Sequence, residues 1–268
     1  MDLGKRDVSR LRQASTTRRI TAREWAYPAT KIYLFLLLIC QRSLSMILWV
    51  DMTMVWGQVF CMWQTIIFHP WEGGEGKITA QYTMSLLGMA RKALSEGCYV
   101  EAEKLLKDAL VYPENLGEGK LEGKKDNHLY YHLGLALEGQ GRNEEAKDCF
   151  ETATIGTDEP AGAMYYNDQP ADMILYQGLA YLKPGKVREA KSRFYRLIDY
   201  GEQHLEDQMR VEYFAVSLPD SLIFDEDYTS KNRAHCYYLM ALGNMGLGDD
   251  NKAAGFLKEA ISYDVPGI

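Results

Sequence analysis

Residues 141–153 read Gly141-Arg-Asn-Glu-Glu-Ala146-Lys-Asp-Cys-Phe150-Glu-Thr-Ala153, and this arrangement of glycine, alanine and a large apolar residue recurs along the chain. In every copy alanine follows glycine after five residues, and leucine or phenylalanine follows four residues later. A small residue stands seven positions before each glycine. The four copies are Ala90/Gly97/Ala102/Leu106, Gly134/Gly141/Ala146/Phe150, Gly178/Gly185/Ala190/Phe194 and Ala241/Gly248/Ala253/Leu257.

Each copy is typical of two antiparallel helices joined by a short turn. Glycine ends the first helix because it adopts the left-handed conformation easily. Small residues let the two helices approach closely, and the large apolar residue fills the space between one pair and the next. One pair cannot bury its own apolar face, whereas a stack of pairs can. The pattern is that of a tetratricopeptide repeat and predicts an all-α superhelical stack of about four helix pairs, starting near Thr83, Asn127, Ala171 and Ala234.

The repeat starts are further apart than the roughly 34 residues of a minimal repeat, so long inserts separate the pairs. The inserts, and the stretch before the first repeat, are aromatic, acidic and rich in glycine and proline. Aromatic rings stack on sugar faces while carboxylates and amides bind hydroxyl groups. These segments are therefore interpreted as a candidate glycan pocket formed by Trp71, Glu72, Glu75, Tyr165, Tyr166, Asn167, Asp168 and Asp220.

A structural interpretation of the inserts stays open. In it the inserts widen the stack, their tyrosines fill gaps between helix pairs, and their acidic residues cap helices. Four residues are placed as helix N-caps in this interpretation, namely Asp126, Asn127, Asp172 and Asn232. The acidic run 225–227 lacks the residue order of a calcium loop and is interpreted as a solvated turn.

The first helices of the pairs provide a second candidate site. The second and fifth positions of the repeats line the concave surface of a right-handed stack, which usually accepts an extended peptide. The candidate partner-binding residues are His128, Tyr131, Asp172, His235 and Tyr238. Tyrosines are common anchors of protein interfaces. The alternative is that these side chains pack against an insert.

Charge and motifs exclude several classes of function. The chain has a net charge of −7 and an acidic main body, which argues against nucleic acid as a partner. Its five cysteines form no CxxC pair, so we expect no disulfide framework, no metal site and a cytoplasmic location. The sequence contains no phosphate-binding loop, serine-hydrolase elbow or zinc-protease motif. We expect no cofactor and lean against an enzyme, although carboxylates among the pocket residues leave glycoside hydrolysis open.

Residues 1–67 differ from the rest, because a basic stretch is followed by apolar sequence without a clear period. Three interpretations stay open: a signal peptide or a signal anchor within residues 32–68, a buried helix that packs on the rest, and a segment that is not part of the native fold. An anchor would have to cross Arg42 or Asp51, which is costly in a bilayer. We expect the third interpretation, with residues 68–268 forming the repeat domain.

Long segments of the main body resemble the C-terminal tetratricopeptide region of large bacterial proteins that carry a domain of unknown function. The stretches that match are 69–77 (HPWEGGEGK), 112–120 (YPENLGEGK), 163–170 (AMYYNDQP) and 213–220 (YFAVSLPD). In that family the region follows a β-sandwich similar to galactose mutarotases. The resemblance implies a carbohydrate-related context. Because the sandwich is missing here, we expect a truncated member.

The sequence thus predicts a non-catalytic interaction or scaffold module that binds a protein or peptide, the missing sandwich domain included. Two alternatives stay open. One is an accessory part of a carbohydrate-active protein whose inserts help to form a glycan site. The other is a membrane-anchored scaffold.

Overall fold

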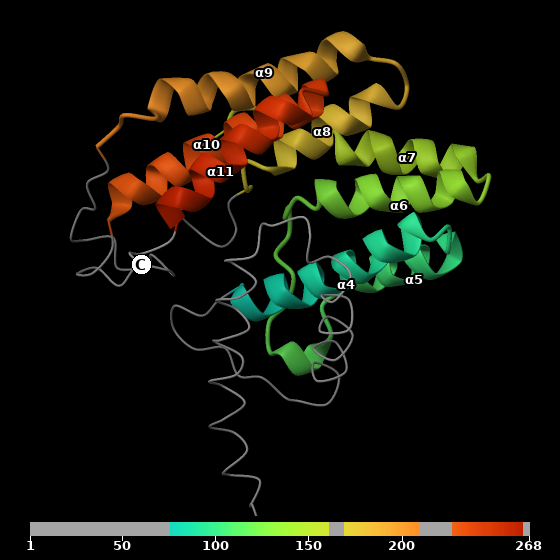
Figure 1. Ribbon diagram of the computed structural model, residues 1–268. Coiled ribbons are helices and arrows are strands. Elements are labelled where there is room, and N and C mark those ends of the chain that lie inside the picture. Colours follow the sequence, from blue (N-terminus) through green and yellow to red (C-terminus); the bar gives the residue numbers. More distant parts are fainter. Residues whose placement is uncertain (1–75, 161–168, 209–226, 265–268) are drawn as a thin grey trace, which may run out of the picture. The chain divides into compact units, whose positions relative to one another are not determined.

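The computed structural model describes residues 76–160, 169–208 and 227–264, and these residues form helices and connecting segments without a β-strand (Figure 1). The long connections each follow the second helix of a pair. The helices are α4 (Lys77–Ser95), α5 (Tyr99–Ala109), η2 (Glu114–Leu116), α6 (Asn127–Gly139), α7 (Asn143–Ala153), α8 (Met173–Leu182), α9 (Val187–His204), α10 (Tyr228–Leu247) and α11 (Asp250–Asp264).

Consecutive α-helices pack in pairs, as the sequence pattern predicts. The pairs are α4 with α5, α6 with α7, α8 with α9 and α10 with α11. Neighbouring pairs contact one another through α5 and α6, α7 and α8, and α9 and α10. The first helices also contact each other, α6 with α8 and α8 with α10, which places residues of successive first helices side by side.

The four turn glycines adopt the left-handed conformation that the sequence predicts. Their φ angles lie between +75° at Gly97 and +82° at Gly248. At the second turn the amide of Gly141 donates to the carbonyl of Glu138 at 2.9 Å, and the amide of Arg142 donates to the carbonyl of Leu137 at 3.0 Å. This is the Schellman arrangement, and the other three turns repeat it. A side chain with a Cβ is strained there, which explains the glycine in each copy.

Small and large residues face each other inside the pairs. A Cβ added to Gly134 of α6 would lie 2.5 Å from the ring of Phe150 of α7. Gly178 and Phe194 stand in the same relation in the third pair. In the first and fourth pairs alanine replaces glycine and leucine replaces phenylalanine. The combined volume of the small and the large side chain is therefore similar in all four pairs, and the two helices of each pair approach closely.

Two first helices begin about two turns earlier than predicted. Helix α4 starts at Lys77 rather than near Thr83, and α10 starts at Tyr228 rather than near Ala234. At both early starts a carboxylate accepts hydrogen bonds from the first turn of the helix. The Glu118 carboxylate accepts hydrogen bonds from the amide of Gly76 at 2.9 Å and from the hydroxyl of Thr79 at 3.1 Å. At α10 the Asp227 carboxylate accepts from the amides of Thr229 and Ser230.

The N-cap predictions are correct in part. Asp126 and Asp172 occupy the N-cap positions of α6 and α8, but neither side chain makes a capping hydrogen bond. Asn127 is the first residue of α6 rather than its N-cap, and its Nδ2 donates to the carbonyl of Ala153 at the end of α7. Asn232 lies inside α10, and its Nδ2 donates to the carbonyl of His204. The prediction for Asn232 is wrong because α10 already begins at the Asp227 cap.

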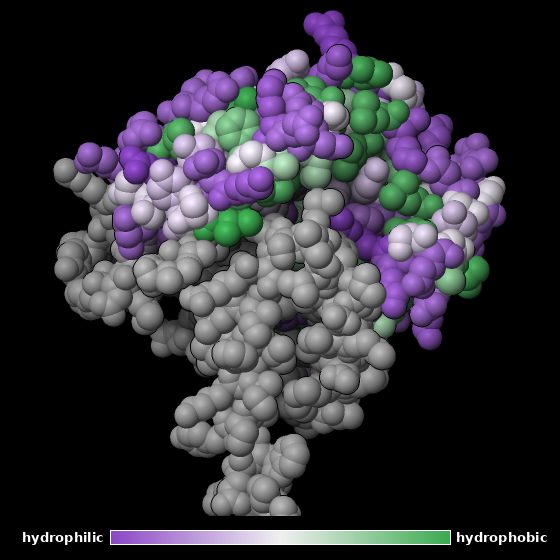
Figure 2. Space-filling model, viewed as in Figure 1, coloured by the Kyte–Doolittle hydropathy of each residue, from purple (hydrophilic) through white to green (hydrophobic). Residues whose placement is uncertain are grey.

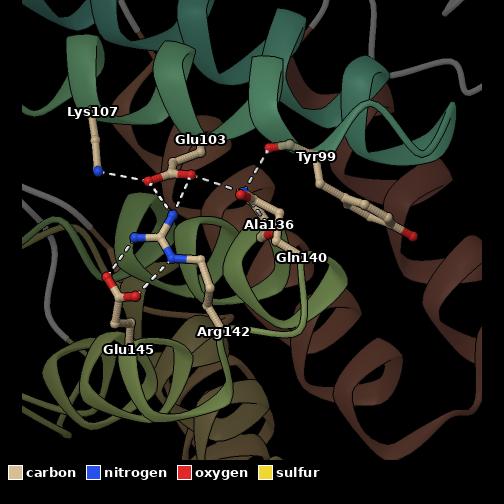
Figure 3. Close-up of polar contacts among 7 residues, drawn as sticks. All are labelled: Tyr99, Glu103, Lys107, Ala136, Gln140, Arg142 and Glu145. Carbon is tan, nitrogen blue, oxygen red and sulfur yellow. Dashed lines mark hydrogen bonds and ion pairs between the residues drawn. The ribbon is translucent and has the colours of Figure 1, made fainter.

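A charged network joins the first two helix pairs (Figure 3). Arg142, in the turn after α6, donates from Nη1 to both carboxylate oxygens of Glu103 on α5, at 2.9 and 2.8 Å. Its Nε donates to Glu145 of α7 at 2.7 Å. Glu103 also accepts from Lys107 at 2.6 Å and from Gln140 at 2.8 Å. Because these donors stabilise its charged form, above all Lys107, the pKa of Glu103 falls to about 2.

Candidate functional site

The predicted glycan pocket lies outside the described residues. This applies to all eight of its members, Trp71, Glu72, Glu75, Tyr165, Tyr166, Asn167, Asp168 and Asp220. The pocket and the glycan partner therefore stay predictions. The same is true of residues 1–67 and of the anchor proposed within residues 32–68. Of the acidic run 225–227, only Asp227 is described, and its carboxylate caps α10.

The predicted partner-binding residues are all described, and two of them lie together. His128 and Tyr131 of α6 gather with Tyr176 of α8, with ring centroids 6.0 Å and 6.1 Å from that of Tyr176. His132 completes the group, at 5.7 Å from Tyr176 and 5.4 Å from Tyr131. We call these four side chains the aromatic cluster. It spans the contact between the second and third helix pairs.

Burial disfavours the charged form of both imidazoles of the aromatic cluster. His132 donates from Nδ1 to the carbonyl of His128 at 2.6 Å, so its Nε2 carries the lone pair. The Nδ1 atom of His128 lies 3.1 Å from the sulfur of Met173. Burial leaves both side chains less than a tenth exposed and lowers the pKa of His128 to about 3 and that of His132 to about 4. Neighbouring cations add to the shift: Lys124 and Lys120 act on His128, and Arg91 acts on His132.

Asp172 and Tyr238 are near enough to Tyr176 for the three groups to influence one another's pKa values. Burial raises the pKa of Asp172 to about 6. The pKa of Tyr238 is raised by burial first and then by the charges of Asp172 and Tyr176. Helices α8 and α10 are in contact, so the aromatic cluster extends through these residues to the fourth pair. His235 is separate from them and packs edge-on against Tyr200 of α9, with centroids 6.4 Å apart.

Two residues of the aromatic cluster were missed by the sequence reasoning. His132 stands four residues after His128, and Tyr176 stands four residues after Asp172. Residues four apart lie on the same face of a helix. A search for aromatic residues one turn beyond the second repeat position would have found both.

The first insert is a folded segment held by two lysines. Lys120 donates to the carbonyl of Leu110 at 2.9 Å and pairs with Asp126 at 2.5 Å. Lys124 donates to the hydroxyl of Tyr112 at 2.5 Å. Leu116 is fully buried in this segment. Together with the Glu118 cap on α4, these contacts give the first insert a structural role.

The second insert is fastened where it meets the helices. The side-chain amide of Gln169 pairs with the backbone of Thr157, accepting from its amide at 3.0 Å and donating to its carbonyl at 2.8 Å. Gln177 of α8, fully buried, donates to the same carbonyl at 2.9 Å. Asp158 forms an ion pair with Arg193 of α9 at 2.9 Å. The two ends of this insert are thereby fixed to the third helix pair.

The described surface carries side chains of mixed polarity. On the face shown in Figure 2, hydrophilic residues are interspersed with hydrophobic ones. None of the described helices is long and apolar enough to cross a membrane. Within the same residues, no three side chains of histidine, cysteine, aspartate or glutamate gather as metal ligands would.

Comparison with known proteins identifies the repeat. The tetratricopeptide repeat model matches residues 128–154, which span most of α6 and α7. Among solved structures, the chain is similar to a crystal structure of MamA, with 17% sequence identity and a TM-score of 0.26; the match covers 68% of this chain and 78% of that chain. The repeat match, the paired helices and the four glycine turns agree with one another. The described residues have an all-α, tetratricopeptide-like fold.

Proposed function

We propose that this protein is a non-catalytic interaction module that binds an extended segment of another protein along the first helices of its pairs. Tetratricopeptide repeats generally mediate protein–protein interaction. The observation that carries the proposal is the gathering of half-buried tyrosines from three successive first helices, Tyr131 of α6, Tyr176 of α8 and Tyr238 of α10.

The chemistry of these residues favours a peptide. Tyrosine offers a large ring and a hydroxyl group at a small cost in side-chain entropy, which is why it is common among interface anchors. The two imidazoles beside the tyrosines are buried and support the rings from behind rather than forming part of the surface. Such a surface suits a partner segment that presents apolar side chains and its own backbone groups.

Site-specific photo-crosslinking tests this proposal. A photoreactive phenylalanine analogue is placed at Tyr131 or at Tyr238 in the full chain, and crosslinked proteins from the source cell are identified by mass spectrometry. Tyr195, half exposed on α9, is the matched control position. We expect the same partner peptide to be crosslinked from both first-helix positions and not from Tyr195.

A second measurement checks affinity. The crosslinked peptide is synthesised, and its binding is measured by calorimetry with Tyr238→Ala and Tyr195→Ala. We expect Tyr238→Ala to weaken binding at least tenfold, since anchor truncation costs about 2 kcal/mol, and Tyr195→Ala to leave it unchanged. Equal crosslinking from all three positions, or equal affinity of both variants, would overturn the proposal.

A further inference from the structure

The contact between the second and third helix pairs contains an unusual arrangement of titratable groups. His128 and His132 of α6 pack against Tyr176 of α8, and both imidazoles are buried. Burial disfavours the charged form of each imidazole, whereas an imidazole in water binds a proton readily near pH 6.5. We call this contact the α6–α8 joint.

Charged and titratable groups from α4, the first insert, α6 and α8 face the two imidazoles. Helix α4 contributes Arg91, and the first insert contributes Lys120 and Lys124, all of which disfavour a charged imidazole. Helix α6 itself contributes Tyr131, and α8 contributes Tyr176 and, at its N-cap, the half-buried Asp172. Asp126, two residues before His128, is paired with Lys120 at 2.5 Å. In the described part of the chain, no carboxylate is among the groups that shift the pKa of either histidine.

We propose that the α6–α8 joint is an acid-sensitive element, which opens at mildly acidic pH while the helix pairs on either side stay folded. The pairs themselves are held by apolar contacts, such as Phe150 on Gly134 and Phe194 on Gly178, and these do not titrate. Opening would separate Tyr131 from Tyr176. The inference concerns the fold and does not depend on the proposed function.

The sign and size of the effect follow from proton linkage. Both histidines have a lower pKa in the closed joint than the ordinary value near 6.5, so the open form binds more protons as the pH falls. Two such groups raise the opening equilibrium by about 1,000-fold between pH 7.5 and 5.0. Asp172 acts in the opposite direction, because its pKa is raised in the closed joint. Its contribution reduces the acid-induced increase in the opening equilibrium by about tenfold. The net expectation is an increase of about 100-fold.

Hydrogen exchange of the full chain tests the inference. Exchange rates, corrected for the intrinsic effect of pH, are compared between amides of α6 and α8 and those of α11 at about pH 7.5 and 5.0. We expect opening of α6 and α8 to increase about 100-fold and that of α11 to change little. The double variant His128→Gln/His132→Gln keeps polar side chains that do not titrate. In it, acid should make opening rarer rather than commoner, because only the contribution of Asp172 remains.

The matched control is His204→Gln, which removes a partly exposed imidazole of α9 outside the joint and should leave the response as in the wild type. Equal acid sensitivity of α6, α8 and α11, or a double variant that responds like the wild type, would overturn the inference. Should the double variant fail to fold, NMR titration of the histidines in the wild type tests the inference instead. Imidazoles of His128 and His132 that stay neutral in the closed form at pH 5 support it, and protonation near pH 6.5 without opening contradicts it.

Discussion

Arg142 and Glu103, which are 39 residues apart in the sequence, form a hydrogen-bonded ion pair between the first two helix pairs, with Nη1 of Arg142 at 2.9 and 2.8 Å from the two carboxylate oxygens. Glu103 is 9% exposed, so its charge depends on these donors rather than on water. Arg142 immediately follows the left-handed Gly141, and the turn therefore directs the guanidinium back towards α5.

Replacing Arg142 should weaken the contact between the first two pairs. Arg142→Ala leaves the nearly buried Glu103 without its guanidinium donor, and we expect a loss of about 1–3 kcal/mol in the free energy of unfolding. Urea unfolding of the full chain measures it. Arg188→Ala on the exposed side of α9 is the control and should change stability by less than about 0.5 kcal/mol. Similar small effects of both substitutions would contradict the structural role of the pair.

Glu103 should also make stability depend on acid pH. Its pKa is about 2 in the folded chain and near 4.5 when unfolded, so its stabilising contribution is present above about pH 4.5 and is lost as the pH falls towards 2. Glu103→Gln removes that contribution. We expect the variant to be less stable than the wild type at about pH 6 and the difference to shrink by about pH 3, as measured by urea unfolding. A difference that stays constant with pH would show that Glu103 is not held in its charged form.

The close approach of α6 and α7 should tolerate no added methyl group. Gly134→Ala places a Cβ 2.5 Å from the ring of Phe150, and we expect a destabilisation of about 1–3 kcal/mol despite the better helix propensity of alanine. Phe150→Leu in the same chain should recover part of the loss, because the first and fourth pairs combine alanine with leucine. Thermal or urea unfolding of the two single variants and the double variant gives the coupling.

The matched control for Gly134 is Gly255 of α11, whose Cβ position is open. Gly255→Ala should stabilise the chain by about 0.5–1 kcal/mol through helix propensity alone. Destabilisation by both alanines would indicate that the cost at Gly134 does not come from the Phe150 ring.

The start of α4 should depend on Glu118 of the first insert. Glu118→Ala removes the acceptor for the amide of Gly76 and the hydroxyl of Thr79, and we expect the first two turns of α4 to lose about 1 kcal/mol of protection. Hydrogen exchange of residues 77–83 measures this loss. Glu122→Ala, exposed in the same insert, is the control. Unchanged exchange in the Glu118 variant would refute the cap.

Much of the repeat could be predicted because its signals are local. Gly141, Ala146 and Phe150 lie within ten residues of one another, and the turn and helix geometry set their relation. The starts of α4 and α10 could not be placed in the same way. At α4 the cap comes from Glu118, about forty residues further along the chain, and such a contact leaves no trace in the helical period. Half of the aromatic cluster could be predicted from the sequence, since the repeat positions indicated His128 and Tyr131 but not His132 and Tyr176.

The sequence by itself determined the class of fold, the number of helix pairs in the described residues and the glycine turns. These features follow from backbone conformation and from residue sizes at fixed short spacing. Only the tertiary structure decided that Arg142 meets Glu103, that Glu118 caps α4, and that two buried histidines share one joint with Tyr176. The reason is physical: the burial and charge of a side chain depend on groups brought together from distant parts of the chain, whereas a turn depends only on its own residues.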